Sequence, residues 1–406
     1  MKPNRKHRRG TLYLAVLGVS VVVSLLALAG MRTARAHLSA STQGADRTEA
    51  RLLAQSAIEH AMAVFQADAN WRTNYAVDTN YPATAVTAGR GAFTWRLKNA
   101  GGLNRSLSGT GVVGEATCTL TVDLAQPPDL DCALLVEGQL RVDSDCTLTV
   151  EDAPAASNGE FRVDGVVTAN VEGQTIDNNG TITGSQTAPA SLRVLPTAAM
   201  ALDYYKRVGT EFNSSILLST VLSPYANAMG TPNADGIYIV KSNGNNVTIN
   251  NCRIVGTLVV ADLAAGKKVT VSGSVNWEPA YPHYPALLVD GDLEINLNHA
   301  ELTEWLLTPT FNPVGTPFQG QEDTDKSDKF ISSIAGLIYC SGDLTILGNG
   351  SSDRFPDLRG QVLVGGSCRV ESQTMPTIKF DEAPSVTPPP GFDQTDPVVI
   401  VPGSWR

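Results

Sequence analysis

The sequence predicts a mainly β fold with one long N-terminal α-helix, in which most of the chain forms an exported right-handed β-helix, or β-solenoid, with short helical insertions. Three observations lead to this prediction. An uncharged run lies between Arg9 and Arg32, an amphipathic helical pattern follows it, and short alternating strands with Gly or Asn at most corners fill the remainder. The alternative for the strand region is an antiparallel β-sandwich, whose strands should be longer and more evenly spaced.

The uncharged run of 22 residues, from Gly10 to Met31, is long enough to cross a membrane. As a helix it would extend roughly 33 Å, which is the thickness of a bilayer's hydrocarbon core. Five basic residues precede the run, so the positive-inside rule predicts a cytoplasmic N-terminus and an exported remainder. We therefore expect a single-pass inner membrane protein that contacts lipid. A plain anchor and a secretory signal cleaved after Ala34-Arg35-Ala36 stay as alternatives.

Two short motifs flank this run. Residues 8–12 read Arg-Arg-Gly-Thr-Leu, and residues 51–62 read RLLAQSAIEHAM. Together they resemble the leader and the post-membrane segment of PilX-type minor pilins and type II secretion pseudopilins, which are type IV pilin-like proteins. The resemblance covers residues 8–65. It implies a prepilin peptidase as a partner, other pilin or pseudopilin subunits as further partners, and a processing site formed by Arg8, Arg9, Gly10 and Thr11.

One position departs from the major members of that family. Major pilins carry Glu five residues into the mature chain, where this sequence has Ala15. A carboxylate in lipid is costly unless a neighbouring subunit pairs with it, so its absence favours an accessory subunit of pilus assembly or secretion over a self-polymerising one.

The membrane helix is expected to continue outward through residues 11–75. Small and apolar residues recur at steps of three or four on one side, and they are Ala50, Ala54, Ile58, Ala61 and Phe65. No proline interrupts the stretch between Asn4 and Tyr81, and Gly44 is the one obvious weak point. The apolar side is predicted to be a packing interface with the chain's own domain, with a pilus partner, or, as in a pilin, with both.

Composition divides the chain further. We predict a basic leader at 1–10, the helix at 11–75, a small strand region at 76–126, a β-solenoid at 127–383 with an insertion at 299–330, and a Pro-rich tail at 384–406. In the small strand region, residues 92–97 and 111–124 are expected to be strands joined by a turn around 101–109. The apolar end of the tail, Val398–Val401, should add to the chain's own sheet or to a partner's edge.

Four segments of the β-solenoid region share one pattern. Each has an apolar triplet, a Gly turn, and two apolar residues separated by a polar one, and they occupy 134–142, 287–295, 337–346 and 362–370. Such an internal repeat is typical of stacked turns. Similar turns occur behind PilX-type N-termini. Two helical pieces interrupt the pattern, one at 196–207, opened by a proline and a capping Thr, and one turn at 300–307.

Charge and motifs argue against nucleic acid binding and against catalysis. Beyond the first ten residues, 25 basic and 40 acidic side chains leave a net charge of −15, which disfavours contact with phosphates.

His283 and His299 lie outside any nucleophile motif, and the carboxylates Asp290, Asp292 and Glu294 are expected to face solvent. We predict a non-enzymatic accessory pilin or pseudopilin. The alternatives are a membrane-anchored or secreted β-helix enzyme acting on polysaccharides, and a cell-surface scaffold.

One loop suggests a metal. Within residues 321–328, Asp323, Asp325 and Ser327 place oxygen ligands at the alternating spacing of a Ca²⁺ loop, although the Gly and the distal Glu of an EF-hand are missing. The alternative is a solvated acidic loop, and no other cofactor is expected. The six cysteines form no C-x-x-C pair, which argues against zinc. Four of them lie in strand-like stretches and are expected to be small buried hydrophobes, namely Cys146, Cys252, Cys340 and Cys368. Export also permits disulfides.

Overall fold

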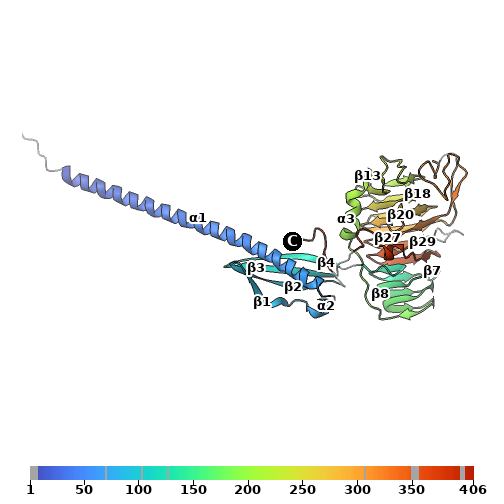
Figure 1. The fold of residues 1–406 in the computed structure, drawn as a ribbon, viewed down its shortest axis with the longest axis horizontal. Coiled ribbons are helices and arrows are strands. Elements are labelled where there is room, and N and C mark those ends of the chain that lie inside the picture. Colours follow the sequence, from blue (N-terminus) through green and yellow to red (C-terminus); the bar gives the residue numbers. More distant parts are fainter. Residues whose placement is uncertain are drawn as a thin grey trace, which may run out of the picture. The chain divides into compact units, whose positions relative to one another are not determined.

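The computed structural model describes residues 8–68, 71–101, 104–125, 128–305, 308–348, 356–393 and 398–406. The fold is mainly β with one long N-terminal helix, as predicted (Figure 1). The chain divides into two compact units. The first unit holds the residues up to 100, residues 105–123 and the last two residues, and it comprises the long helix and most of a small sheet. The second unit holds residues 101–104 and 124–404.

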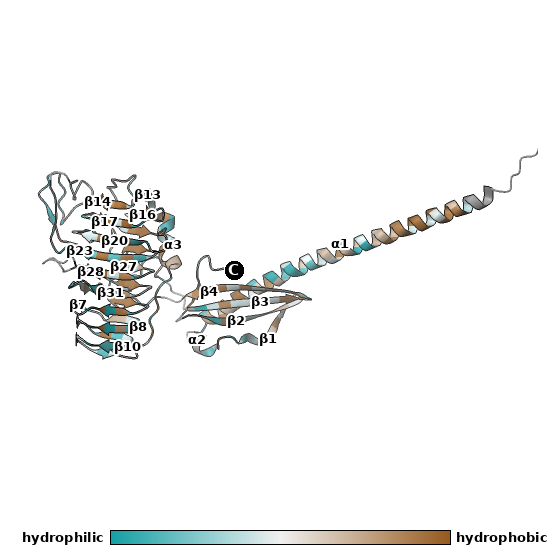
Figure 2. Cartoon of the chain, turned by 180° about the vertical axis from the view of Figure 1, so that it is seen from behind, coloured by the Kyte–Doolittle hydropathy of each residue, from teal (hydrophilic) through white to brown (hydrophobic). Residues whose placement is uncertain are grey.

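Helix α1 runs without a break from Arg8 to Gln66, over 59 residues. No proline lies inside it, so no residue removes a helical hydrogen bond. Hydroxyl groups in the apolar part bond back to the helix itself: Ser24 and Thr33 donate to the carbonyls of Ser20 and Ala29. Figure 2 shows the hydrophobic colouring concentrated in the N-terminal half of α1. Gly44 does not interrupt the helix.

The C-terminal part of α1 packs on an antiparallel sheet. The sheet order is β1 (Asn80–Ala88), β2 (Gly91–Gly101), β3 (Asn104–Val113), β4 (Ala116–Ala125) and β33 (Val399–Ile400), and a short helix α2 (Trp71–Asn74) follows α1. Strand β33 pairs antiparallel with β4. The end of the tail therefore adds to the chain's own sheet, which is the first of the two alternatives expected for Val398–Val401.

The small sheet differs from its sequence prediction. Residues 111–124, expected as one strand, are split between β3 and β4 by a turn at Gly114, whose φ is +56°. Gly109, expected in a turn, is a strand residue, and Gly111 is a strand residue as expected. A Cβ on Gly109 would lie 2.3 Å from the carbonyl oxygen of Ala54, and one on Gly111 would lie 2.2 Å from that of Ala50. The close approach of α1 requires both glycines, and Gly109 imitates a turn signal.

The second unit consists of parallel strands in three stacks. The first stack runs β13 (Thr210–Asn213), β16 (Ile237–Lys241), β19 (Thr257–Val260), β22 (Pro285–Val289), β27 (Leu337–Cys340), β30 (Val362–Val364), β5 (Leu134–Val136), β8 (Ala155–Val163), β10 (Val171–Asn178) and β12 (Gln186–Thr187). The second runs β14 (Ile216–Leu218), β17 (Val247–Asn250), β20 (Lys268–Gly273), β23 (Asp292–Leu297), β28 (Leu344–Leu347), β31 (Cys368–Glu371), β6 (Leu140–Val142) and then β8, which is long enough to join both stacks.

The third stack runs β15 (Val221–Leu222), β18 (Arg253–Val255), β21 (Asn276–Glu278), β26 (Ser333–Ala335), β29 (Asp357–Arg359), β32 (Thr377–Lys379), β7 (Thr147–Glu151), β9 (Val166–Thr168) and β11 (Thr181–Thr183). Each pairing described within the three stacks is parallel. This pairing contradicts the antiparallel β-sandwich. Alternate residues of the strands point inward and form one apolar core.

The four sequence repeats lie in consecutive turns of this arrangement. Leu287 pairs with Ile338, Ile338 with Val362, and Val362 with Leu134. Their shared pattern therefore arises because equivalent residues stack directly upon one another.

The turns do not stack in the order of the sequence. The chain enters the stack at residues 134–151, continues to 187 at one end, and resumes with β13 at the other end. From there it proceeds turn by turn until residues 362–379 pack against residues 134–151. Helix α3 (Ala198–Val208) lies on the connection and covers the first stack, burying Leu202 and Tyr205 against its outer side (Figure 1). Its N-cap is Thr197, whose hydroxyl accepts from the Met200 amide, as predicted.

The insertion begins differently from its prediction. Where a helical turn was expected at 300–307, the described residues contain β24 (Leu302–Thr303), which pairs antiparallel with β25 (Lys329–Phe330). Leu302 and Phe330 are buried with Phe311 in a small separate core, so tertiary packing overrides the local helical pattern. In the tail, a short helix α4 (Ala383–Val386) precedes the proline run, and the guanidinium of Arg406 bonds both carboxylate oxygens of Asp123 at 2.7 Å.

Candidate functional site

The predicted processing residues fall at the start of α1. The helix begins at Arg8, so the backbones of Arg8, Arg9, Gly10 and Thr11 are helical. Their side chains, like the whole of residues 1–7 of the predicted leader, lie outside the described part of the structure.

The N-terminal half of α1 exposes a long series of large apolar side chains. Helix α1 is the one helix among the described residues that is long and apolar enough to cross a membrane, and its apolar part is not buried in the protein. The exposed large side chains are Tyr13, Leu14, Val16, Leu17, Val19, Val21, Val22, Val23, Leu25, Leu26, Leu28, Met31 and Leu38. Surfaces of this kind mark contact with a membrane or a partner.

The predicted packing residues of α1 contact the chain's own sheet. Ala50, Ala54, Ile58, Ala61 and Phe65 are all fully buried. Phe65 stacks on Trp71 at a centroid distance of 4.8 Å and meets Trp95 edge-on at 5.2 Å. The structure shows the intramolecular contact of this face, and its contact with a pilus partner stays a prediction. Leu52, on the opposite side, is exposed.

A buried arginine holds the insertion on the second unit. Arg253 of β18 is fully buried and donates to the carbonyl oxygens of Phe311 at 2.7 Å, Thr316 at 2.8 Å and Pro317 at 2.7 Å. Its guanidinium also lies over the rings of Phe318 and Phe330. Burial lowers the pKa of Arg253, while the nearby Glu278 and Glu304 act to raise it.

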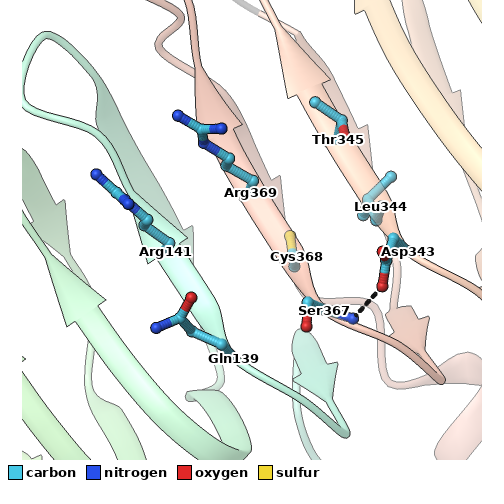
Figure 3. A pocket seen from close by; sticks show the side chains of 8 residues that line it. All are labelled: Gln139, Arg141, Asp343, Leu344, Thr345, Ser367, Cys368 and Arg369. Carbon is cyan, nitrogen blue, oxygen red and sulfur yellow. Dashed lines mark hydrogen bonds between the residues drawn. The ribbon is translucent and has the colours of Figure 1, made fainter.

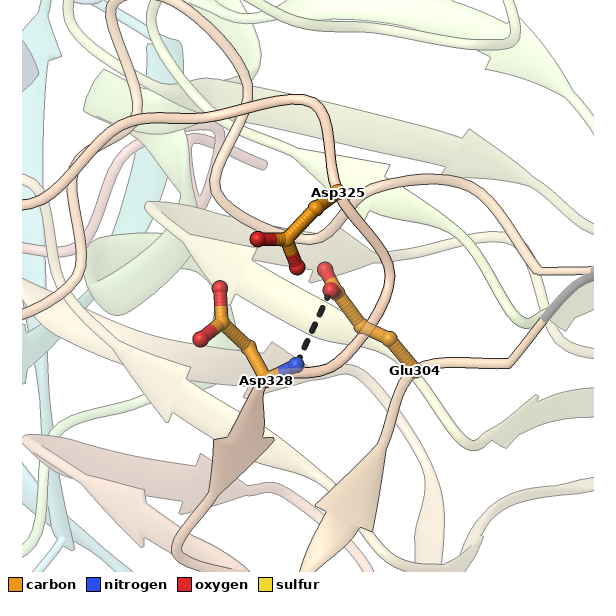
Figure 4. Close-up of side chains that lie close together, drawn as sticks. All are labelled: Glu304, Asp325 and Asp328. Atoms are coloured by element: carbon orange, nitrogen blue, oxygen red, sulfur yellow. Dashed lines mark hydrogen bonds between the residues drawn. The ribbon is translucent and has the colours of Figure 1, made fainter.

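The insertion also gathers carboxylates. Oxygen atoms of Glu304, Asp325 and Asp328 lie within 4.8 Å of one another (Figure 4). Glu304 is buried, and its two oxygens accept from the backbone amides of Phe311 and Asp328. Burial raises the pKa of Glu304, and the charges of Asp328 and Asp323 add to that rise against the effect of the two amides.

The predicted metal ligands are brought together only in part. Asp325 belongs to the carboxylate group, whereas Asp323 and Ser327 serve its loop: the Asp325 amide donates to Asp323 Oδ1 at 3.2 Å, and the Ser327 hydroxyl donates to Asp325 Oδ1 at 2.7 Å. The sequence prediction missed Glu304 because it considered one contiguous loop, and Glu304 is joined to that loop only by the β24–β25 pairing. No local spacing signals such a ligand.

A groove of about 270 Å³ lies on the second stack (Figure 3). Its two arginines are already paired: Arg369 bonds Asp143 at 2.7 Å and Glu371 at 2.9 Å, and Arg141 bonds Asp143 at 2.8 Å. The groove is therefore close to balanced in charge. Its floor carries the buried Cys368, and burial raises the pKa of that thiol to about 12, so it is a poor nucleophile.

The other residues considered for catalysis have local partners. Asp290 accepts from the Ser341 hydroxyl at 2.9 Å, Asp292 accepts from the Asp343 amide at 2.9 Å, and Glu294 pairs with Lys268. His283 packs edge-on against Tyr284. These contacts tie neighbouring turns together and leave the catalytic prediction of the sequence unchanged.

The six cysteines are all free thiols in the structure. The four predicted to be small buried hydrophobes are buried, Cys132 is buried as well, and Cys118 is half-buried. Burial raises the pKa of Cys252 to about 11.

Comparisons with known proteins give little further information. No known family matches the sequence, and no curated protein matches it either. Among solved structures, the competence-associated pilin ComZ from Thermus thermophilus aligns with 12% identity over 89% of this chain and 97% of its own, with a TM-score of 0.25. A superposition of that quality establishes neither a shared fold nor a shared function.

Proposed function

We propose that this protein is a non-enzymatic accessory pilin or pseudopilin, of the PilX-like kind, that takes part in type IV pilus assembly or type II-like secretion. The observation that carries the proposal is the division of α1. One unbroken helix exposes an apolar N-terminal half and buries its C-terminal part against a small antiparallel sheet. A helix built in this way is anchored to its domain at one end and free to enter a membrane or a bundle of similar helices at the other.

The steps of this role follow from the N-terminus. The basic leader stays in the cytoplasm, a prepilin peptidase cuts between Gly10 and Thr11, and the apolar half of α1 waits in the inner membrane. Extraction into a fibre exchanges lipid contacts for helix contacts. Ala15 supplies no carboxylate to pair with a neighbouring subunit, so this chain joins a fibre as an accessory subunit.

The second unit is the displayed part in this proposal. We infer that residues 134–379 form a right-handed β-solenoid head, supported by the three stacks of parallel strands and by the strong preference of parallel crossovers for right-handed connections. The paired arginines and carboxylates of its described grooves support an assembly or adhesive role over catalysis. Hydrolysis or lysis of acidic polysaccharides by the purified protein would overturn the non-enzymatic part.

The N-terminus of the mature protein tests the proposal. We expect a chain that starts at Thr11 when the protein is expressed with a prepilin peptidase, and one that keeps Met1 without it, as measured by mass spectrometry. Gly10→Val should abolish cleavage. Gly18→Val, a matched change at a position with nothing within 4 Å of the added Cβ, should leave it intact. A chain that starts at His37 would indicate a secretory signal, and an intact Met1 with the peptidase present would indicate a plain anchor, so either result contradicts the pilin role.

A further inference from the structure

A groove of about 280 Å³ lies where the insertion meets one corner of the stacked turns. Part of its lining comes from the residues that directly follow four neighbouring strands of the second stack, β14, β17, β20 and β23. Each of these residues has a hydroxyl or amide side chain, and they are Ser219, Asn251, Ser274 and Asn298. Neighbouring strands are about 4.8 Å apart, so the groove offers polar side chains at a regular spacing over about 14 Å.

The neighbouring turns hold these corner residues in place. Oδ1 of Asn251 accepts from the Ser274 amide at 3.0 Å. The Asn298 amide donates to the Gly273 carbonyl at 2.8 Å. Because the bonds run from one turn to the next, the polar row is fixed at its spacing, and a ligand would lose little binding energy in ordering it.

The insertion contributes an aromatic ring to the same groove. Trp305 lines the groove and is 57% exposed. The hydroxyl of Thr308 accepts from the Trp305 amide at 3.0 Å and donates to the Trp305 carbonyl at 2.8 Å, which fixes the backbone of this tryptophan. An indole ring whose backbone is fixed and whose surface is open to solvent is suited to stack on a flat ligand.

The groove carries little charge. Glu301 is the one charged residue among the described residues that line it, and it pairs with Lys329 at 3.7 Å. Anionic polymers are bound by clustered Lys and Arg side chains, which this described lining does not contain. Hydrolysis of a glycosidic bond uses a pair of carboxyl groups, and the same lining supplies one. The groove therefore fits an uncharged ligand that is bound without being cleaved.

We propose that this groove binds an uncharged polysaccharide, with one sugar ring stacked on Trp305 and hydroxyls of the neighbouring sugars bonded to the polar corner residues. The C–H groups on the face of a sugar ring carry partial positive charge and pack on the electron-rich face of an indole. Sugar hydroxyls both donate and accept hydrogen bonds, as Ser hydroxyls and Asn amides do. One sugar unit of an extended polysaccharide also advances by about the spacing of neighbouring strands. The site belongs to the second unit alone and does not depend on the pilin role.

Calorimetry on the full-length protein, in a detergent without a sugar head group, tests the proposal. The probes are cellohexaose, chitohexaose, maltohexaose and mannohexaose, with hexagalacturonate as the anionic comparison. We expect at least one uncharged probe to bind with a dissociation constant of about 1 mM or less, at least about tenfold more tightly than hexagalacturonate, and to be recovered intact. No binding of the four uncharged probes at about 10 mM, a preference for hexagalacturonate, or cleavage of the bound probe would overturn the proposal.

Matched variants locate the site. Trp305→Ala removes an exposed ring and should lower the affinity at least about tenfold, while Trp305→Phe keeps a ring and should lower it less. Trp405→Ala removes a tryptophan that is 45% exposed in the first unit, and its affinity should stay within about twofold of the wild type. Thr303→Val, an exposed change of similar shape in the groove, should weaken binding about threefold. Stacking should shift the tryptophan emission in the wild type and in W405A but not in W305A. Equal affinity of W305A and the wild type would refute the proposal.

Discussion

At the scale of single residues, the second unit keeps the full positive charge of Arg253 in its interior. Arg253 can be buried because the fork of its guanidinium meets carbonyl oxygens from the insertion and lies over two aromatic rings. A lysine offers the same charge as a point donor without that planar geometry. Among the described residues of the insertion, the small apolar core holds Leu302, Phe311 and Phe330, with Phe318 packed against it, and we regard the Arg253 side chain as the main anchor of the insertion.

Arg253→Met should release the insertion. The substitution leaves the carbonyls of Phe311, Thr316 and Pro317 without their donor, and each buried unpaired group costs about 1–3 kcal/mol. We expect the unfolding free energy to fall by about 3 kcal/mol or more, measured by chemical denaturation, with faster hydrogen exchange across residues 308–318. Arg253→Lys should lower the unfolding free energy by less than Arg253→Met does. Unchanged exchange in the insertion of R253M would contradict the anchoring role.

Thiol reactivity provides another residue-level test. Cys118 is half-buried, whereas burial raises the pKa of Cys146, Cys252 and Cys368 and keeps their thiolate populations low. In the native protein at pH 8 we expect an alkylating reagent to modify Cys118 first and the other five at least about 100-fold more slowly. All six should react in denaturant, and mass spectrometry of peptides distinguishes the sites. Rapid native modification of Cys252 or Cys368 would show that the turns open.

At the scale of elements, the contact between α1 and its sheet depends on the absence of side chains. Small residues on the helix face, Ala50 and Ala54, lie directly over Gly111 and Gly109 of β3, so that the two backbones approach closely. Large residues follow only where the helix ends, with Phe65 packed between Trp71 and Trp95. The C-terminal end of α1 is therefore held by aromatic packing at Phe65, and the part around Ala50 and Ala54 is held by close backbone contact with β3.

Gly109→Ala should separate the helix from the sheet. The added methyl would lie 2.3 Å from the Ala54 carbonyl oxygen and 2.9 Å from an Ile58 side-chain carbon, so neighbouring atoms must move at a cost of about 1–3 kcal/mol. Thermal unfolding of the first unit, followed by tryptophan fluorescence, should shift to lower temperature. Gly44→Ala is the matched control, since nothing lies within 4 Å of its added Cβ, and it should be neutral or stabilising by up to about 1 kcal/mol. Equal behaviour of the two variants would contradict this account.

These same elements show what the sequence could and could not predict. The long helix, the capped helix α3 and the stacked repeats were predictable because periodicity, a capping Thr and repetition are local signals. The hairpin at 104–125 was not predictable, because Gly109 allows the close approach of α1 and imitates a turn signal. Glu304 was not either, since only the pairing of β24 with β25 brings it to Asp325. Both failures concern contacts between segments far apart in the chain.

At the scale of the whole molecule, the second unit is stacked in an order that differs from the order of its sequence. Residues 362–379 complete the stack by packing on residues 134–151, which occur more than 200 residues earlier in the sequence. In a stack where each turn contacts its neighbours, stability is close to a sum of turns and interfaces. The interface between these two segments, the seam, therefore joins two sets of turns that residues 188–209 connect along the chain.

Leu140→Ala tests the seam. Leu140 of β6 is fully buried, and it pairs with Cys368 on one side and with Phe161 on the other. Its truncation should cost about 2–5 kcal/mol and raise hydrogen exchange in β31 and β8 together, although these strands are about 200 residues apart in the chain. Leu217→Ala is the matched control, because Leu217 is equally buried but lies in the end strand β14 and pairs only with Ile249 among the described residues. It should raise exchange in β14 and β17 while leaving β31 protected. If L140A left the protection of β31 unchanged, the two sets of turns would be energetically independent, and the seam would be a contact without a role in stability.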